Sequence, residues 1–299
     1  MKWRPAPAKD SKAPGGWICA KANVGARPRF GANCDKQGRE RGFSGIPAVD
    51  RQNRSKLPFT FPWPPLCGLC LMTPLFPACR QLLLCLAADW DAPDGRLQRF
   101  ECLPAGGWRA VGPVLPVSLG RAGLAWGRGL HPAQPGRSKQ EGDGRAPAGA
   151  FAISALFGYG AADSLLARAA KLPYRCATRD LKCVDDPASA HYNRVVDQSA
   201  VTVDWASCEE MLRGDARYAA GAVVAHNTAP PTAGCGSCIF LHVWEAPGVA
   251  TEGCTAMALA DMTAIAGWLD GAAAPVLVQL PQAAYDDLRE TWGLPELAD

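Results

Sequence analysis

The 299-residue sequence lacks an apolar run that could cross a membrane as a helix. Its most apolar stretch, Leu57–Ala78, contains six prolines, and each proline removes a helical hydrogen bond. The stretch follows Arg51, Arg54 and Lys56, as the apolar region of an export signal follows a basic one. Two interpretations stay open: a degenerate export signal, and a mis-assigned translation start with Met72 as an internal candidate. Neither includes an integral membrane span.

The sequence also lacks an even distribution of charge. Residues 1–78 hold 13 basic and 4 acidic residues, whereas the remainder holds 18 basic and 24 acidic ones. The basic part has no regularly spaced aromatic residues and no helical stripe, so we expect no nucleic-acid binding. It is rich in Pro, Gly, Arg and Lys without any period. The pattern predicts a disordered extension over residues 1–78 and a folded domain over residues 79–299.

The cysteines are too sparse for a disulfide scaffold, at 13 in the whole chain. Nine lie in residues 79–299, and an odd number leaves at least one thiol unpaired even if all the others form disulfides. That permits a reactive cysteine. Cys235 and Cys238 are plausible disulfide partners in an exported protein, and small core residues in a reducing compartment.

Apolar periodicity after residue 79 predicts an α+β domain that is mainly β, with a curved or sandwiched sheet and a few peripheral helices. No internal repeat is present. The runs typical of strands are Gln81–Leu86, Arg96–Cys102, Trp108–Val111, Val114–Leu119, Gly221–Ala225, Ile239–Trp244 and Ala274–Leu280. The helical patterns are Ala162–Lys171, Ala206–Arg213, Ala256–Leu269 and Gln282–Trp292, and Gly120–Gly149 reads as a long loop.

Cys254 and His242 are the strongest candidates for chemistry. His242 lies on a strand-like run, and Cys254 follows twelve residues later on a turn flanked by Gly253. A thiol nucleophile needs a base within hydrogen-bond distance, and amides near the turn can receive an oxyanion. A main-chain carbonyl can orient the imidazole as well as a carboxylate can. The alternatives are a buried structural cysteine and a core histidine.

A zinc site competes for the same residues. Cys235, Cys238, His242 and Cys254 supply three sulfurs and one imidazole, which is a tetrahedral zinc set. This arrangement would make the chain a zinc-stabilised binding module rather than an enzyme. A redox pair of Cys235 and Cys238 is a third possibility.

Further polar segments are candidates for binding. His226 follows a predicted strand, at a place where it would form one wall of a cleft or simply a polar turn. The segment Asp185–Arg194 is polar and typical of a loop, and its paired aspartates suit metal or acid/base chemistry or a capped turn. Asn193 and Arg194 end this segment, and Arg194 can hold a carboxylate bidentately.

Three blocks together resemble the L,D-transpeptidase (YkuD-type) catalytic domain. They are KQEGDGRAPAGAF (Lys139–Phe151), CVDDPASAHYNRVV (Cys183–Val196), and GSCIFLHVW with TEGCTAM (Gly236–Met257). The likeness extends over about Arg80–Pro295 and excludes the first 78 residues.

The resemblance implies a curved, mostly β catalytic domain of an exported, monomeric enzyme of the bacterial cell wall. It implies Cys254 as nucleophile, His242 as general base, the Val243 carbonyl as orienting group, and the amides of Gly253 and Cys254 as oxyanion hole. The thiolate would attack a peptidoglycan stem peptide and expel D-alanine, and an amine from another stem would complete a cross-link. No metal or organic cofactor is implied, and the location would be the periplasm or cell envelope.

The sequence departs from the family pattern beside the nucleophile. Glu252 stands where many relatives have histidine, and Ala256 stands where they have arginine. Substrate anchoring is therefore expected to differ, with Arg194, Asn193, His226 and Arg145 as the candidates. A peptidoglycan amide hydrolase or carboxypeptidase is the nearest alternative, because water replacing the acceptor amine is enough for that reaction.

Overall fold

A computed structural model describes residues 75–297 of the chain. The chain divides into two units, residues 1–66 and 67–299, and the described residues belong to the second. The predicted disorder of residues 1–78 therefore falls almost entirely outside the described residues. The packed part begins before the predicted boundary at residue 79, since Phe76 is buried in the main core.

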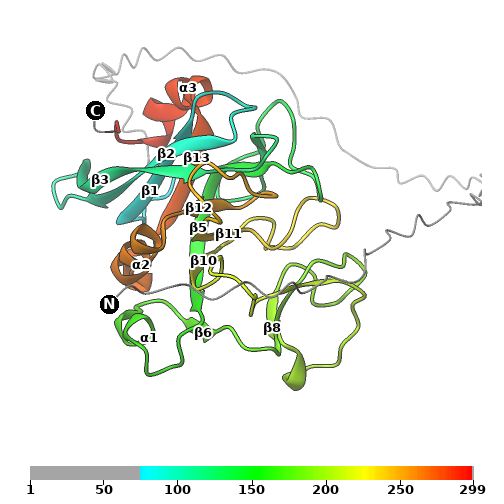
Figure 1. Ribbon diagram of the computed structural model, residues 1–299. Helices are drawn as coiled ribbons and strands as arrows, with labels where there is room; N and C mark the ends of the chain where they lie inside the picture. Colours follow the sequence, from blue (N-terminus) through cyan, green and yellow to red (C-terminus); the bar gives the residue numbers. More distant parts are fainter. Residues whose placement is uncertain (1–74, 298–299) are drawn as a thin grey trace, which may run out of the picture. The chain divides into compact units, whose positions relative to one another are not determined.

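Ten strands form one large sheet (Figure 1). Its strands are β1 (Gln81–Ala87), β2 (Asp94–Cys102), β3 (Trp108–Ser118), β4 (Leu124–Trp126), β5 (Ala146–Gly158), β6 (Tyr174–Cys176), β10 (Ala220–Val224), β11 (Phe240–Val243), β12 (Thr255–Met257) and β13 (Val276–Pro281). The order runs β10-β11-β12-β3-β2-β1-β13-β5-β4, and β6 pairs with β5. Because β5 also pairs with β10, the sheet closes into a ring. The predicted α+β, mainly β class is confirmed in this coarse form.

Buried apolar residues pack on both faces of the closed sheet, as β1 shows. All seven residues of β1 are buried, because it lies between β2 and β13 with both faces covered. Such a strand reads as a continuous apolar run rather than an alternating one. The predicted runs at Trp108–Val111 and Val114–Leu119 form one strand, β3, and the predicted loop Gly120–Gly149 contains β4 and the start of β5.

Three α-helices accompany the strands: α1 (Leu165–Ala169), α2 (Leu259–Trp268) and α3 (Gln282–Trp292). The prediction for α3 is confirmed at both ends. Gly293 ends it in the left-handed conformation, and its N–H reaches the carbonyls of Arg289 and Glu290. Within the described residues, none of the helices is both long and apolar enough to span a membrane.

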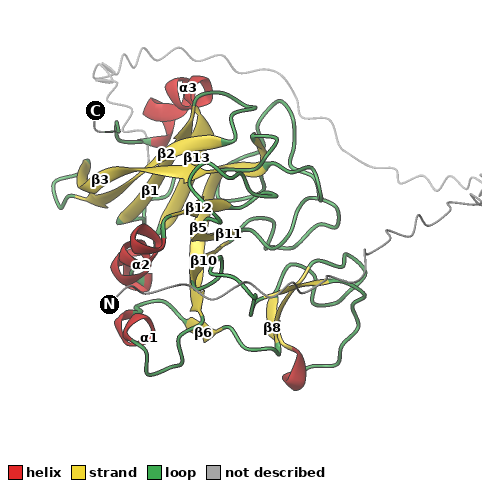
Figure 2. Ribbon diagram, in the orientation of Figure 1, coloured by secondary structure: helices red, strands yellow, loops and turns green. Residues whose placement is uncertain are grey.

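A second, three-stranded sheet has the order β8-β7-β9 and comprises β7 (Leu181–Val184), β8 (Val195–Asp197) and β9 (Cys208–Glu210). Figure 2 shows long loops on the side of the structure where β8 lies. The predicted helix Ala206–Arg213 is wrong, because β9 occupies its centre and pairs with β7. Pairing between distant segments overrides local helical spacing here.

A disulfide joins Cys183 of β7 to Cys238, just before β11. The suggested pairing of Cys235 with Cys238 is therefore wrong, and Cys235 is a free thiol. The disulfide connects the small sheet to the residues that precede the His242 strand. It also fixes one wall of the cavity described next.

Candidate active site

A cavity of about 440 Å³ lies over the ends of β11 and β12. Cys254 and His242 line it together with Gly253, and the loop Lys139–Gly142 supplies another wall. The segment from Glu209 in β9 to Tyr218 closes a further side. The nucleophile and base predicted from the sequence thus meet in one cavity.

Strand register puts Cys254 and His242 on one face of the sheet. Strands β11 and β12 are parallel, with Leu241 opposite Thr255 and His242 opposite Ala256. One step earlier, the Phe240 N–H donates to Cys254 Sγ at 3.3 Å. Residues two apart on a strand share a face, so the side chains of Phe240, His242 and Cys254 point to the same side.

Desolvation keeps the Cys254 thiol protonated. Its Sγ donates weakly to the Cys238 carbonyl at 3.6 Å. Burial raises the pKa of Cys254 to about 12, and the Glu209 carboxylate adds to the rise. A thiol with this pKa is a weak nucleophile at neutral pH unless a base removes its proton.

His242 is a neutral base with a fixed tautomer. Its Nδ1 lies 2.8 Å from the Val243 carbonyl, which can only accept, so Nδ1 carries the hydrogen and Nε2 keeps its lone pair. This is the orienting contact expected from the sequence. The ring packs edge-on against Tyr218, with centroids 5.4 Å apart. Burial lowers the pKa of His242 to about 4, although the Val243 carbonyl opposes the shift.

The turn before the nucleophile requires glycine at position 253. Gly253 has φ +150°, and a Cβ there would lie 3.0 Å from the Arg145 carbonyl oxygen. Its N–H donates to Thr251 Oγ1 at 3.1 Å, and the same hydroxyl donates to the Cys254 carbonyl at 2.7 Å. Among the described residues, no hydrogen bond is made by the Cys254 N–H. This amide, rather than that of Gly253, is thus free to receive an oxyanion.

Two of the predicted substrate-binding residues have their polar groups occupied. Asn193 donates to the carbonyls of His226 and Asn227, both at 2.8 Å, and accepts the Cys238 N–H at 3.0 Å. His226 is buried; its Nε2 donates to the Cys235 carbonyl at 2.9 Å, and its Nδ1 accepts the Arg128 N–H at 3.2 Å. Neither residue lines the cavity. Asn193 instead holds Cys238 in place beside the nucleophile.

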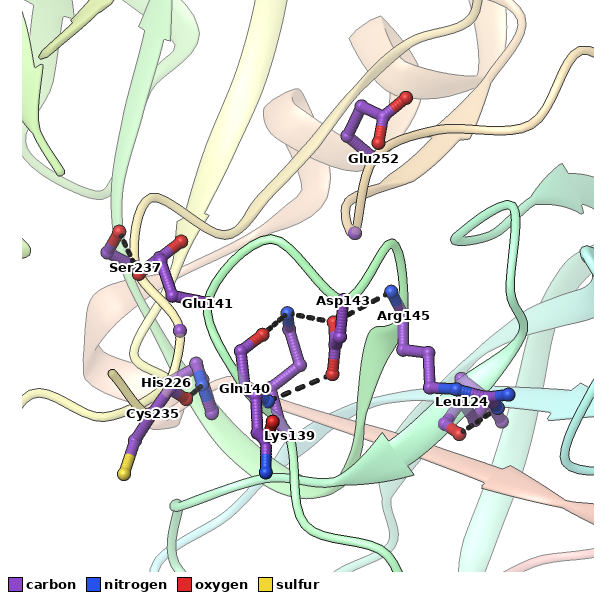
Figure 3. Close-up of polar contacts among 12 residues, drawn as sticks. Leu124, Lys139, Gln140, Glu141, Asp143, Arg145, His226, Cys235, Ser237 and Glu252 are labelled. Atoms are coloured by element: carbon purple, nitrogen blue, oxygen red, sulfur yellow. Dashed lines mark hydrogen bonds and ion pairs between the residues drawn. The ribbon is translucent and has the colours of Figure 1, made fainter. Parts of the chain in front are cut away.

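The other two also lie outside the cavity lining. Arg145 donates to the carbonyls of Trp90 and Leu124, both at 2.9 Å, and pairs with Asp91 at 2.7 Å. Figure 3 shows its side chain extending toward Leu124, on the side away from Glu141. Arg194 is exposed. Arg145 therefore holds the segments of Trp90, Asp91 and Leu124 together beside the site.

The polar groups that do face the cavity escaped the sequence interpretation. Glu209, Arg213, Arg217 and Tyr218 come from one segment, and Glu141 comes from the Lys139 loop. Glu141 accepts from Ser237 at 2.8 Å (Figure 3) and from Tyr192 at 3.0 Å. The charged residues clustered after Cys208 were the available signal. Glu209 and Arg213 fell in the predicted helix Ala206–Arg213, and no role at the site was assigned to them.

The zinc interpretation is wrong for the proposed ligand set. The Cys238 sulfur is bonded to Cys183, so it cannot bind a metal ion as a thiolate. Within residues 75–297, no three His, Cys, Asp or Glu side chains are grouped to hold a metal ion. The same disulfide excludes a redox pair of Cys235 and Cys238.

A protonated thiol, a neutral imidazole with a free Nε2 and an unpaired amide N–H are the parts of a nucleophilic acyl-transfer site. They are arranged in a cavity that also carries charged groups of both signs. No family model, no curated protein and no solved structure matches this chain.

Proposed function

We propose that the protein is a cysteine acyl-transferase of the L,D-transpeptidase type that acts on peptidoglycan stem peptides. The observation that carries the proposal is the register of β11 and β12, which brings Cys254 and His242 to one face with Nε2 free. The three sequence blocks that resemble the family support the substrate class. The Cys183–Cys238 disulfide supports an oxidising compartment such as the periplasm or cell envelope.

In the proposed acylation step, Cys254 Sγ attacks the carbonyl carbon of the scissile amide while its proton passes to His242 Nε2. The carbonyl oxygen becomes an oxyanion and accepts from the Cys254 N–H. Collapse breaks the C–N bond, and the imidazolium returns the proton to the leaving nitrogen. D-alanine departs, and a thioester remains on Cys254.

In the second step, an amine of another stem attacks the thioester and gives its proton to His242. Collapse releases the cross-linked peptide, and the imidazolium reprotonates the departing Cys254 thiolate. Water in place of the amine gives a tripeptide by the same route, so product analysis separates transferase from hydrolase. No metal or organic cofactor takes part in either step.

The test follows products and protein mass together. The full chain is incubated with a disaccharide-tetrapeptide, and released D-alanine and covalent adducts are measured. We expect D-alanine release and a transient adduct on Cys254. Cys254→Ala should abolish both while the fold is retained, since this change is small.

Cys102→Ala is the matched control, because Cys102 is a half-buried free cysteine on β2 outside the cavity. It should keep full activity. An active Cys254→Ala protein, or wild-type protein that forms neither D-alanine nor adduct, would contradict the proposed function.

A further inference from the structure

Arg213 is a cavity-lining cation with unused hydrogen-bond donors. Its side chain is 28% exposed and pairs with Asp215 most closely through Nε, at 3.4 Å. In the described part of the chain, its two terminal nitrogens donate no hydrogen bond. A guanidinium offers these donors as a planar fork that matches a carboxylate.

The guanidinium is held in position before any ligand binds. Its Cζ lies 5.1 Å from the centroid of the Tyr218 ring, and the Tyr218 hydroxyl donates to Glu209 at 2.5 Å. The Tyr218 ring also packs against His242, with centroids 5.4 Å apart. Tyr218 therefore contacts both Arg213 and His242, which places the guanidinium on the imidazole side of the cavity.

The other cations that line the cavity form closer ion pairs than Arg213 does. Lys139 pairs with Asp143 at 2.5 Å. Arg217 pairs with Asp215 at 2.7 Å and with Glu245 at 3.5 Å. Asp215 is thus held mainly by Arg217, which is the first cause of the lowering of its pKa to about 2. Arg213 remains as the cation available to a ligand.

We propose that Arg213 binds the C-terminal carboxylate of the residue that leaves as D-alanine, and so selects peptides that end at that residue. This inference rests on the proposed function. His242 must reach the leaving nitrogen to return its proton, and the leaving residue carries its carboxylate two bonds from that nitrogen. The anion therefore falls on the imidazole side of the scissile bond, where Arg213 lies.

The test compares a tetrapeptide stem with the same peptide amidated at its C-terminus. We expect wild-type kcat/KM to be roughly 10- to 100-fold higher for the acid, as a charge-assisted hydrogen bond implies. Arg213→Gln should lower kcat/KM for the acid to near that for the amide, so that the acid-to-amide ratio of kcat/KM falls to about one. Arg213→Lys keeps the charge without the fork, and should keep part of the preference.

Arg194→Gln is the control, because Arg194 is an exposed arginine outside the cavity. It should keep the full preference. Equal wild-type rates for acid and amide would overturn the inference, even if Arg213→Gln failed to fold. D-alanine release in the same experiment would leave the proposed function standing.

A second measurement needs no peptide turnover. Iodoacetate and iodoacetamide alkylate the same thiol with loss of iodide, and only the first carries a carboxylate. If the protein processed neither peptide, the proposed function would fail. The ratio of the two alkylation rates at Cys254 would then decide whether an anion site exists. The rate with iodoacetate divided by the rate with iodoacetamide should fall at least several-fold in Arg213→Gln. An unchanged ratio would overturn the assignment.

Discussion

At the residue scale, burial sets the pKa values of Cys254 and His242 in opposite directions. It raises that of the thiol to about 12 and lowers that of the imidazole to about 4. The resting pair is therefore neutral over the whole physiological range. In the proposed mechanism the thiol gains reactivity when its proton moves to Nε2 during attack.

This neutral pair predicts the pH dependence of acylation. His242 has a lowered pKa, so it is an effective base above that pKa and is lost as a base when the pH falls through about 4. We expect kcat/KM for D-alanine release to be flat from about pH 6 to pH 9 and to fall only at lower pH. Stopped assays across this range check it. A change in kcat/KM between pH 6 and pH 8 would contradict a neutral resting pair.

His242→Gln tests the base directly. Glutamine keeps polar atoms at the site but cannot take up the thiol proton, so we expect D-alanine release to fall by about 10²-fold or more. The residual activity of the variant should not show the decrease at low pH that is expected for the wild type. Thermal unfolding measured in parallel shows whether the variant is folded. A folded variant with near wild-type activity would contradict the assigned role.

Gly253 predicts a backbone effect on stability. Alanine there must adopt φ +150° and place its Cβ 3.0 Å from the Arg145 oxygen, so we expect a loss of about 1–3 kcal/mol in the free energy of unfolding. Gly267→Ala is the matched control. Gly267 lies within α2 with open space around it, and alanine should leave stability unchanged or raise it by up to about 1 kcal/mol. Urea denaturation compares the two, and equal effects would contradict the role of the turn.

At the element scale, the Cys183–Cys238 disulfide connects β7 to the approach to β11 across a separation of 55 residues. Chain entropy assigns about 4 kcal/mol to a closed loop of this size. The double variant Cys183→Ala/Cys238→Ala should lose stability of that order. A reductant should shift wild-type unfolding in the same way and leave the double variant unchanged. Wild-type protein with verified free thiols and undiminished stability would contradict this prediction.

The same scale shows what local sequence can and cannot predict. Helix α3 is amphipathic and ends at Gly293, so its limits follow from its own residues. Strand β9 depends on pairing with β7, where Lys182 lies opposite Glu210 at a separation of 28 residues, and its local spacing indicated a helix. The pair of Cys254 and His242 could be predicted from the sequence because both residues flank one turn. Arg213 and Tyr218 were missed because they reach the site only through tertiary structure.

At the scale of the whole molecule, three buried histidines couple folding to pH. Burial lowers the pKa of His226 and of His242 to about 4, and it also lowers that of His131. The unfolded chain binds protons at these sites near pH 6.5, whereas the folded protein does not. Stability is therefore complete above pH 6.5 and is lost as the pH falls toward 4.

The expected size of this effect makes it measurable. A pKa of about 4 against 6.5 implies that His226 and His242 each reduce the free energy of unfolding by about 2 kcal/mol between pH 7 and pH 5. Urea denaturation at these two pH values measures the loss. The His226→Gln variant should lose less free energy of unfolding between pH 7 and pH 5 than the wild type, and the difference should equal about the contribution of one histidine. The reason is that glutamine can donate to the Cys235 carbonyl without titrating. Unchanged stability at pH 5 would show that the two imidazoles are protonated in the folded protein, and His242 would then be unable to act as the base for Cys254 at that pH.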